Sequence, residues 1–475
     1  MMHTRYIKSI FWIQIFFQLI SIEVRSHEIT NVKLNPHPTP DQLAWLEQSD
    51  IGFLIHYNMA TYIPVEYDGC NRVPSLVPDI DLFYPDTVDT DNWVQTFVDT
   101  GAKYAILVAK HNCGFATWPT NVHFQLTTNE TINYNYSVTY SPVSDTDYVD
   151  HFVDSCNQAG IKTGVYYSAI WNNWLNVQDA RVQPGPLAPG QMPITQETYE
   201  SIVLQQLEEL WSNYGPLLEI WFDGGYSQSL KAGISMLVQK YQSNASIFNG
   251  FGLTNNSIRN IGNEFGYANE DTWLTVNDDG QEDPNGNHYS VPECPTTLQV
   301  SDRWFYGGAD FPIRPLQELI DTYHTTVGRN CKLVFDLAVG RDGLVDQKHA
   351  IRYKEFGDYI RDCYGKPLAS EFNCSGNICI LRFPSTQLAD RVVIRENLRS
   401  PSGASIRQWS LDGLMMWGDC LSCWIPIPPA KGQSIGNKRI VLFGEAVLMQ
   451  GIRFNVYSTV GGPPVLAQFD AYLCQ

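Results

Sequence analysis

Between about residue 45 and residue 365, short apolar runs alternate with segments whose apolar residues recur at helical spacing. Short runs rich in β-branched and aromatic residues, bounded by Gly, Asn and Asp, are typical of strands. Eight such runs occur, at residues 51–57, 103–110, 162–169, 218–224, 246–251, 260–264, 298–304 and 332–338. The pattern therefore predicts eight strands in this part of the chain.

Several of the intervening segments are amphipathic, namely 91–101, 147–160, 197–215 and 315–328. In 147–160, an early Asp and a final Gly enclose one apolar stripe, as in a capped surface helix. Eight strands alternating with helices predict a parallel α/β fold, and the count favours a (β/α)8-like (TIM) barrel over residues 27–365. A doubly wound open sheet is the alternative. It is disfavoured because no Gly-rich phosphate loop follows the first strand.

After Pro367 the helical periodicity stops and short alternating runs replace it. Six such runs follow, at residues 377–383, 390–397, 405–413, 438–443, 450–458 and 465–473. Many short strands without helices are typical of a β-sandwich. We therefore expect an all-β sandwich domain over residues 366–475. Before it, the Pro- and Gly-rich stretch 176–193 predicts a long loop at the rim of the barrel.

The N-terminus has the features of a signal peptide. Arg5 and Lys8 precede an apolar run from Ile10 to Ile22, and polar residues follow. We expect residues 1–26 to be removed. The run is shorter than the roughly 20 residues that a transmembrane helix needs, so a membrane anchor is the weaker alternative. The mature chain is then expected to be soluble, and either secreted to the extracellular space or held in an acidic lumen such as a lysosome or vacuole.

Eleven cysteines in an exported chain predict several disulfides and at least one free thiol. Cys374 with Cys379, and Cys420 with Cys423, are spaced for short local bridges. The second pair is also half of a zinc motif, but no second pair or nearby histidine completes it, so we expect no metal. Five sequons predict glycosylation at Asn129, Asn135, Asn244, Asn255 and Asn373.

The formal net charge is −19, from 31 basic and 50 acidic residues. Such a field repels nucleic acid and anionic membranes, so neither is an expected partner. The acidic balance suits a neutral substrate.

In a (β/α)8 enzyme the active site lies at the carboxyl ends of the strands. The predicted strand ends carry His56, His111, Tyr166 with Tyr167, Asp223, Glu264 and Trp304. Two carboxylates among aromatic side chains are the equipment of a glycosidase. The set contains no His-x-His or three-carboxylate metal pattern, and the chain has no Gly-x-Ser-x-Gly elbow for a serine nucleophile.

Asp223 ends the apolar run LLEIWFDGG. Within the run, Glu219, Trp221 and Asp223 alternate with apolar residues and are expected to point into the barrel. The two glycines after Asp223 allow a sharp turn that keeps the carboxylate open. The alternative is that Asp223 caps the next helix.

LEIWFDGG resembles the nucleophile segment of the α-L-fucosidases of glycoside hydrolase family 29. Other segments are similar to that family in the same order: IGFLIHYNMATY (51–62), GAKYAILVAKHNCGFATWPT (101–120), NQAGIKTGVYYS (157–168), VGRNCKLVFDLAVGRDGLV (327–345) and SIGNKRI (434–440). The resemblance covers nearly the whole mature chain. It implies a retaining α-L-fucosidase without a cofactor, acting on fucosylated oligosaccharides or glycoproteins.

The resemblance implies that Asp223 is the nucleophile and that a second carboxyl group is the acid/base. The segment IGNEFGYA (261–268) resembles the acid-bearing segment of a subgroup specific for α-1,3- and α-1,4-linked fucose, which points to Glu264. The competing acids are Glu270, Asp271 and Glu293. His111-Asn112-Cys113 and His56-Tyr57 stand where the wider family often has His-His-Asp and His-Trp, and both departures favour that subgroup.

By the same resemblance, His56 and His111 are expected to hydrogen-bond sugar hydroxyls. Tyr166 or Tyr167 would lie near the nucleophile. From their positions at the predicted strand ends, Trp221 and Trp304 are expected to stack on the sugar. The expectation that Arg259 contacts the sugar rests on its position in the chain alone. Each aromatic residue has core packing as its alternative role. Two other readings stay open: a broad-specificity fucosidase that also cleaves α-1,2 or α-1,6 links, and a fucose-binding protein without activity. Cys113 as a nucleophile is a further alternative. The sequence does not predict the oligomeric state.

Overall fold

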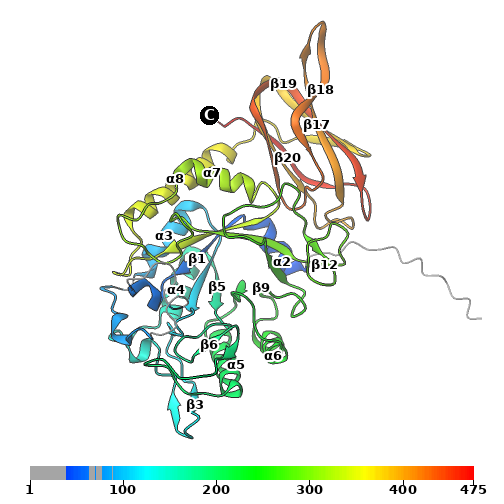
Figure 1. Cartoon of the computed structure of the whole chain (residues 1–475). Coiled ribbons are helices and arrows are strands. Elements are labelled where there is room, and N and C mark those ends of the chain that lie inside the picture. Colours follow the sequence, from blue (N-terminus) through cyan, green and yellow to red (C-terminus); the bar gives the residue numbers. More distant parts are fainter. Residues whose placement is uncertain (1–38, 64–69, 71–76, 88, 475) are drawn as a thin grey trace, which may run out of the picture. The chain divides into compact units, whose positions relative to one another are not determined.

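The computed structural model describes residues 39–63, 70, 77–87 and 89–474. The predicted signal peptide therefore lies outside the described residues. Figure 1 shows a barrel with surrounding helices, followed by an all-β region at the C-terminal end of the chain. Among the described residues, none of the helices is both long enough and apolar enough to span a membrane.

Eight parallel strands close into a barrel, and their order around the barrel follows the chain, so the predicted fold is confirmed. In chain order they are β1 (Ile51–His56), β2 (Tyr104–Lys110), β5 (Lys162–Tyr167), β8 (Glu219–Trp221), β9 (Ser246–Phe248), β10 (Ser257–Asn260), β13 (Val291–Thr296) and β14 (Lys332–Ala338). The barrel closes because β1 pairs in parallel with both β2 and β14.

Two predicted strands lie elsewhere. The sixth barrel strand is β10 and ends at Asn260, where the sequence pattern placed its start. The seventh is β13, which reads VPECPT, whereas residues 298–304 lie in the loop that follows. Two prolines and a glutamate make β13 hard to recognise from the sequence, because proline removes a donor from the ladder and is rare inside sheets.

The helices lie around the barrel, and all but α2 cover its outer side (Figure 1). They are α2 (Pro40–Gln48), α3 (Thr90–Thr100), α4 (Tyr148–Ala159), α5 (Gln196–Asn213), α6 (Lys231–Tyr241), α7 (Leu316–Thr325) and α8 (Gln347–Tyr364). Helix α4 shows how the sequence sets their limits: Asp147 caps its start by accepting from two backbone N–H groups, and Gly160 ends it in the left-handed conformation. In place of a helix, a short turn joins β9 to β10, and the hairpin β11 (Thr275–Val276)–β12 (His288–Tyr289) lies between β10 and β13.

The barrel has two apolar regions. Outward-facing strand residues pack under the helices, as Phe53 does against Phe97 and Tyr353. Inward-facing residues form a second cluster that includes Leu54, Tyr104, Tyr166, Trp221 and Phe248. Three residues of α2, Leu43, Trp45 and Leu46, belong to the same inner cluster. Side chains at the carboxyl ends of the strands therefore lie next to a packed apolar layer inside the barrel.

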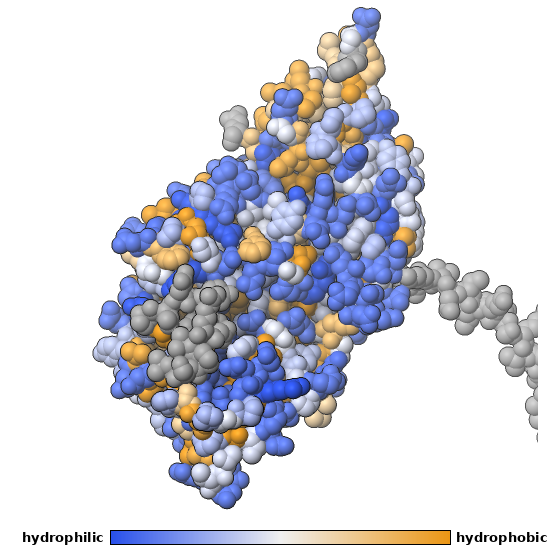
Figure 2. All heavy atoms as spheres, in the orientation of Figure 1, coloured by the Kyte–Doolittle hydropathy of each residue, from blue (hydrophilic) through white to orange (hydrophobic). Residues whose placement is uncertain are grey.

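The C-terminal region is a six-stranded antiparallel sheet. Its strands are β15 (Phe372–Ser375), β16 (Ile378–Glu396), β17 (Ile406–Trp417), β18 (Cys420–Gly432), β19 (Arg439–Thr459) and β20 (Leu466–Tyr472). They enclose their own core, to which Trp409, Phe454 and Phe469 belong. In the view of Figure 2, hydrophilic residues cover most of the barrel, and apolar side chains are more frequent on the sheet. Leu421 and Met416, near the β17–β18 turn, are exposed.

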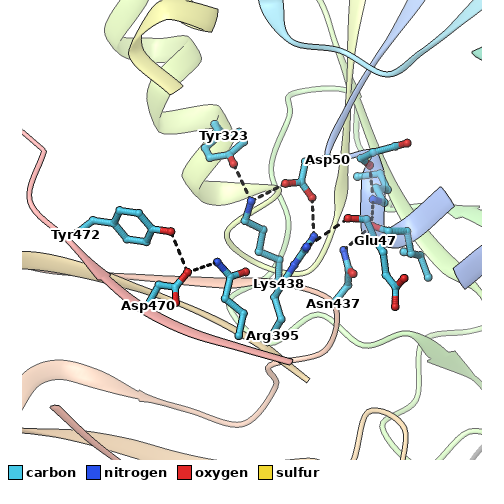
Figure 3. Close-up of polar contacts among 12 residues, drawn as sticks. Glu47, Asp50, Tyr323, Arg395, Asn437, Lys438, Asp470 and Tyr472 are labelled. Carbon is cyan, nitrogen blue, oxygen red and sulfur yellow. Dashed lines mark hydrogen bonds and ion pairs between the residues drawn. The ribbon is translucent and has the colours of Figure 1, made fainter. Parts of the chain in front are cut away.

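Charged residues join the barrel to the sheet (Figure 3). Asp50, next to β1, contacts Lys438 at 2.5 Å and Arg395 at 3.1 Å, and Lys438 also donates to the Tyr323 hydroxyl at 3.1 Å. Asn437 donates to the Leu46 carbonyl at 3.2 Å. The disulfide Cys363–Cys474 links α8 to the chain after β20. Covalent and ionic contacts thus hold the two regions together.

The predicted disulfides and the predicted free thiol are confirmed. Cys374–Cys379 and Cys420–Cys423 are disulfides, as are Cys70–Cys113 and Cys294–Cys331. The remaining cysteine, Cys156, is free and buried. Because Cys113 is disulfide-bonded, it has no thiolate to offer as a nucleophile. The asparagines of all five sequons are exposed, so each is accessible for the predicted glycosylation.

Candidate active site

Asp223 lies in the turn after β8, at the carboxyl end of the strand, and is partly exposed. Gly224 and Gly225 have φ of +63° and +85°, a conformation that favours glycine. A Cβ on Gly224 would also come within 2.2 Å of Ile170. The next helix, α6, starts after Leu230 without a side-chain cap, so the structure rules out the helix-cap alternative for Asp223.

The Tyr166 hydroxyl donates to Oδ2 of Asp223 at 2.8 Å. Burial raises the pKa of Asp223, and the hydrogen bonds from Tyr166 and from the Gly224 backbone oppose that rise. Both bonds favour the ionised form, which a nucleophile requires. Tyr167 points the other way and donates to Gln206 of α5, so Tyr166 is the tyrosine near Asp223.

Glu264 lies in the loop after β10 and is partly exposed. The Trp304 indole Nε1–H donates to its Oε2 at 3.2 Å. Burial raises the pKa of Glu264, and the negative charge of Asp223 raises it further. Two carboxyl groups whose environments differ in this way are suited to separate acid and nucleophile roles.

The competing acids occupy other environments. Glu270 is exposed and faces Arg439 at 3.7 Å. Asp271 accepts hydrogen bonds from the backbone N–H groups of Gln433 and Ser434 in the sheet region. Glu293 is completely buried inside the barrel beneath Trp221. Of the predicted acids, Glu264 alone pairs partial exposure with an influence from Asp223.

His56 and His111 are buried at the ends of β1 and β2, with ring centroids 5.8 Å apart. His56 Nδ1 forms a 2.8 Å hydrogen bond with Asp336, which fixes the orientation of the ring. Burial and His111 lower the pKa of His56, and burial and Lys110 lower the pKa of His111 to about 3. Neutral imidazoles can both donate to and accept from sugar hydroxyls.

Trp304 is half-buried and its ring lies 5.1 Å from that of His56, so it borders both His56 and Glu264. Trp221 is placed differently from our expectation. Its ring stacks on Tyr166 of β5 at 5.5 Å and on Phe248 of β9 at 3.8 Å. Because these strands flank β8 on opposite sides, both faces of the indole are covered and neither is open to a sugar.

Arg259 does not face the site. It alternates with the inward-facing Ile258 on β10 and therefore points outward. Its guanidinium pairs with Glu282 at 2.9 Å and donates to the Trp273 carbonyl at 3.0 Å. The prediction of sugar contact by Arg259, which rested on its position in the chain alone, is therefore wrong.

Sequence reasoning missed two groups at the site. Asp336, which holds His56, lies within the buried strand β14, where a lone aspartate in KLVFDLA was the available signal. Phe305 packs edge-on against His56 at 5.0 Å and His111 at 4.9 Å. No group of three or more His, Cys, Asp or Glu side chains suited to a metal occurs in the part of the chain that the structure describes.

The sequence profile of the α-L-fucosidase family matches residues 65–365. The chain belongs to the α-L-fucosidase family. Among curated members, Alpha-L-fucosidase 1 of Arabidopsis thaliana is 25% identical over 406 residues, which cover 81% of this chain and 72% of that protein. The α-L-fucosidase of Dictyostelium discoideum is 30% identical over 141 residues, 30% of this chain and 26% of the other.

Solved structures of the family share the fold. A candidate α-L-fucosidase from Bacteroides thetaiotaomicron superposes with a TM-score of 0.78 at 27% identity and covers 93% of this chain and 100% of its own. A glycoside hydrolase family 29 member from a rumen bacterium gives 0.75 at 25% identity, covering 93% and 78%. As a member of the fucosidase family, this chain is a glycoside hydrolase, and its substrate class is fucosylated glycans.

Proposed function

We propose that this fucosidase is a retaining enzyme in which Asp223 is the nucleophile and Glu264 the general acid/base. The observation that carries the proposal is the pair of carboxyl groups at one barrel mouth, where the charge of Asp223 raises the pKa of Glu264. In a retaining mechanism, groups about 5–5.5 Å apart act on opposite sides of the anomeric carbon.

In the first step, Asp223 attacks the anomeric carbon while Glu264 donates its proton to the leaving oxygen, and a covalent fucosyl-enzyme forms. In the second step, Glu264 takes a proton from water, the water oxygen attacks the anomeric carbon, and Asp223 leaves as a carboxylate. His56 and His111 orient the sugar through its hydroxyls. Trp304 orients Glu264 and borders the sugar.

The proposed substrates are oligosaccharides or glycoproteins with terminal α-1,3- or α-1,4-linked L-fucose. The sequence 261–268 and the residues after His56 and His111 favour this linkage class over the broad-specificity class. A panel of α-1,2-, α-1,3-, α-1,4- and α-1,6-fucosylated oligosaccharides tests it. Faster hydrolysis of α-1,2 or α-1,6 links would overturn the linkage proposal and leave the mechanism untouched.

The decisive experiment for the mechanism is trapping with a 2-deoxy-2-fluoro-L-fucosyl fluoride, followed by peptide mass spectrometry. We expect the label on Asp223, and ¹H NMR of an early time point of normal hydrolysis should show α-L-fucose first. Label on another residue would overturn the nucleophile assignment, and β-L-fucose as first product would overturn retention. No turnover of an aryl α-L-fucoside by pure protein would instead support a fucose-binding protein.

The charged start and short apolar run of residues 1–26, together with the five disulfides, support export of the chain. We place the mature enzyme outside the cell or in an acidic lumen, without nucleic-acid or membrane partners. N-terminal sequencing of secreted protein tests cleavage near residue 26.

A further inference from the structure

Two glutamates lie inside the barrel below the proposed nucleophile. Glu219 of β8 and Glu293 of β13 are both fully buried. Glu219 is four residues before Asp223 on the same inner side of the strand. Burial raises the pKa of Glu219, and the neighbouring charge of Glu293 raises it further. Buried carboxyl groups are expensive unless they are paired and hydrogen-bonded, so this pair requires an explanation.

One oxygen of the pair has a clear partner. Oε1 of Glu293 accepts the indole Nε1–H of Trp221 at 2.8 Å. The other oxygens, Oε2 of Glu293 and both of Glu219, have no donor among the described residues when both groups are counted as carboxylates. Burial raises the pKa of both glutamates and so favours their protonated form, which supplies a donor that the described residues otherwise lack. Among the described residues, the hydrogen bond from Trp221 is thus the one that ties this pair to its surroundings.

Trp221 connects this unit to the site. Its indole stacks on Tyr166 with centroids 5.5 Å apart and rings inclined by 19°. Tyr166 donates to Oδ2 of Asp223 at 2.8 Å. The contacts therefore run without a gap from Glu293 through Trp221 and Tyr166 to Asp223. Glu293 itself cannot reach a substrate, because it is fully buried under the Trp221 indole.

We propose that Glu293 is a positioning residue for the reaction: paired with Glu219, it holds the Trp221 indole, and Trp221 holds the Tyr166 hydroxyl against Asp223. The inference rests on the proposed role of Asp223. The other ionisable groups around the pair are Tyr104 of β2, whose hydroxyl has no described partner, and Lys332 of β14, whose ammonium donates to the carbonyls of Leu46 and Ser49. Neither Tyr104 nor Lys332 is changed in the variants described below, so their effect is the same in each.

The test is a set of variants assayed with an aryl α-L-fucoside. Glu293→Leu removes the acceptor and leaves a buried indole N–H unpaired, so kcat/KM should fall about tenfold, mainly through kcat. Glu293→Gln keeps a carbonyl oxygen for Trp221 and should stay within about threefold of wild type. In a Trp221→Phe background the indole N–H is absent. There, Glu293→Leu should add less than about a twofold loss.

The pH profile of kcat/KM distinguishes a loss of positioning at Asp223 from a general loss of protein stability. The Tyr166 bond lowers the pKa of Asp223, so its loss raises that pKa and moves the acidic limb of kcat/KM to higher pH. Glu293→Leu should show this movement. The matched control is Glu396→Gln in the sheet, a buried carboxyl group that accepts hydrogen bonds from the backbone of Ser405, Ile406 and Gly436 and from the Ser405 hydroxyl. That variant should lose thermal stability without moving the acidic limb.

Equal losses from Glu293→Leu in the wild-type and Trp221→Phe backgrounds would overturn the proposal. If Glu293→Leu does not fold, the cycle of Trp221→Phe with Tyr166→Phe replaces it: strictly additive losses in kcat/KM overturn the proposal, and losses that do not add support it. Label on a residue other than Asp223 in the trapping experiment refutes the nucleophile assignment. The variant cycle still measures the coupling between Glu293 and Trp221, so the two failures are distinguishable.

Discussion

The Tyr166 hydroxyl lies 2.8 Å from Oδ2 of Asp223, and the two residues come from the ends of neighbouring barrel strands. The hydrogen bond gives the carboxylate a fixed direction at the barrel mouth. It also offsets part of the desolvation that raises the pKa of Asp223. A nucleophile needs both properties, because its charge must be retained and its oxygen aligned in the transition state.

Tyr166→Phe should therefore lower kcat/KM by about tenfold, as expected for loss of a hydrogen bond to a charged group. The acidic limb of the pH profile should move to higher pH. Tyr167→Phe is the matched control, since its hydroxyl bonds to Gln206 on the outer side of the barrel. It should cost about 1 kcal/mol of stability and leave the pH profile unchanged. Steady-state kinetics across pH check both; the same profile for both tyrosine variants would contradict the assignment.

Trp304→Phe should move the basic limb of kcat/KM to higher pH. That limb reports the acid, which must be protonated to act. The Trp304 N–H bond lowers the pKa of Glu264, so its removal raises that pKa and keeps the acid protonated at higher pH. Trp409→Phe removes an indole bond of the same 3.2 Å length from the sheet core and should leave both limbs in place. A basic limb that stays fixed or moves down in Trp304→Phe would contradict this account.

Glu264→Ala should depend strongly on the leaving group. Natural fucosides need protonation of the departing oxygen and should lose about a hundredfold or more in kcat/KM, within the usual worth of general acid catalysis. Aryl fucosides with acidic leaving groups should lose far less in the first step. Azide should then restore turnover and give a fucosyl azide of retained configuration, identified by NMR. The control is Glu270→Ala, which removes an exposed carboxylate from the same loop after β10, and it should behave as wild type.

Much of the fold was predictable because each signal was local. The helix limits followed from capping residues, as with Asp147 and Gly160 around α4. Alternation along LEIWFDG placed Asp223 at a strand end and Trp221 on the inner face. The strand VPECPT was not predictable in this way, because its prolines and glutamate are tolerated only in the finished barrel, where neighbouring strands and Trp221 pair with them.

In the candidate site, too, local signals were predictable and contacts between distant strands were not. The positions of His56, His111 and Glu264 followed from strand ends and resemblance. The partners of His56 and Trp221 did not. Asp336 and Glu293 lie on strands distant in sequence, and only the closed barrel brings Asp336 to His56 and Glu293 to Trp221. The prediction for Arg259 failed because it rested on position in the chain alone: on β10, Arg259 alternates with the inward-facing Ile258 and points outward.

Asp50 provides a prediction about stability that is independent of catalysis. Burial acts to raise its pKa, but the charges of Lys438, Arg395 and Lys332 outweigh burial and hold the pKa far below its usual range. A carboxylate of this kind stabilises the fold above its unfolded-state pKa, near 3.9. The stabilisation is lost as the pH falls toward the folded-state pKa.

Asp50→Asn leaves Lys438 and Arg395 without their carboxylate between barrel and sheet, so it should cost about 3 kcal/mol of unfolding free energy at pH 7. Because the wild type loses this contribution in acid, the difference between the two proteins should shrink as the pH is lowered below about 4. Chemical denaturation at pH 7, 5 and 3 measures it. The control is Glu47→Gln, which breaks an exposed pair with Arg399 at the same boundary and should change stability by no more than the error of the fit. A difference between Asp50→Asn and wild type that is constant from pH 7 to pH 3 would contradict the assignment of a depressed pKa to Asp50.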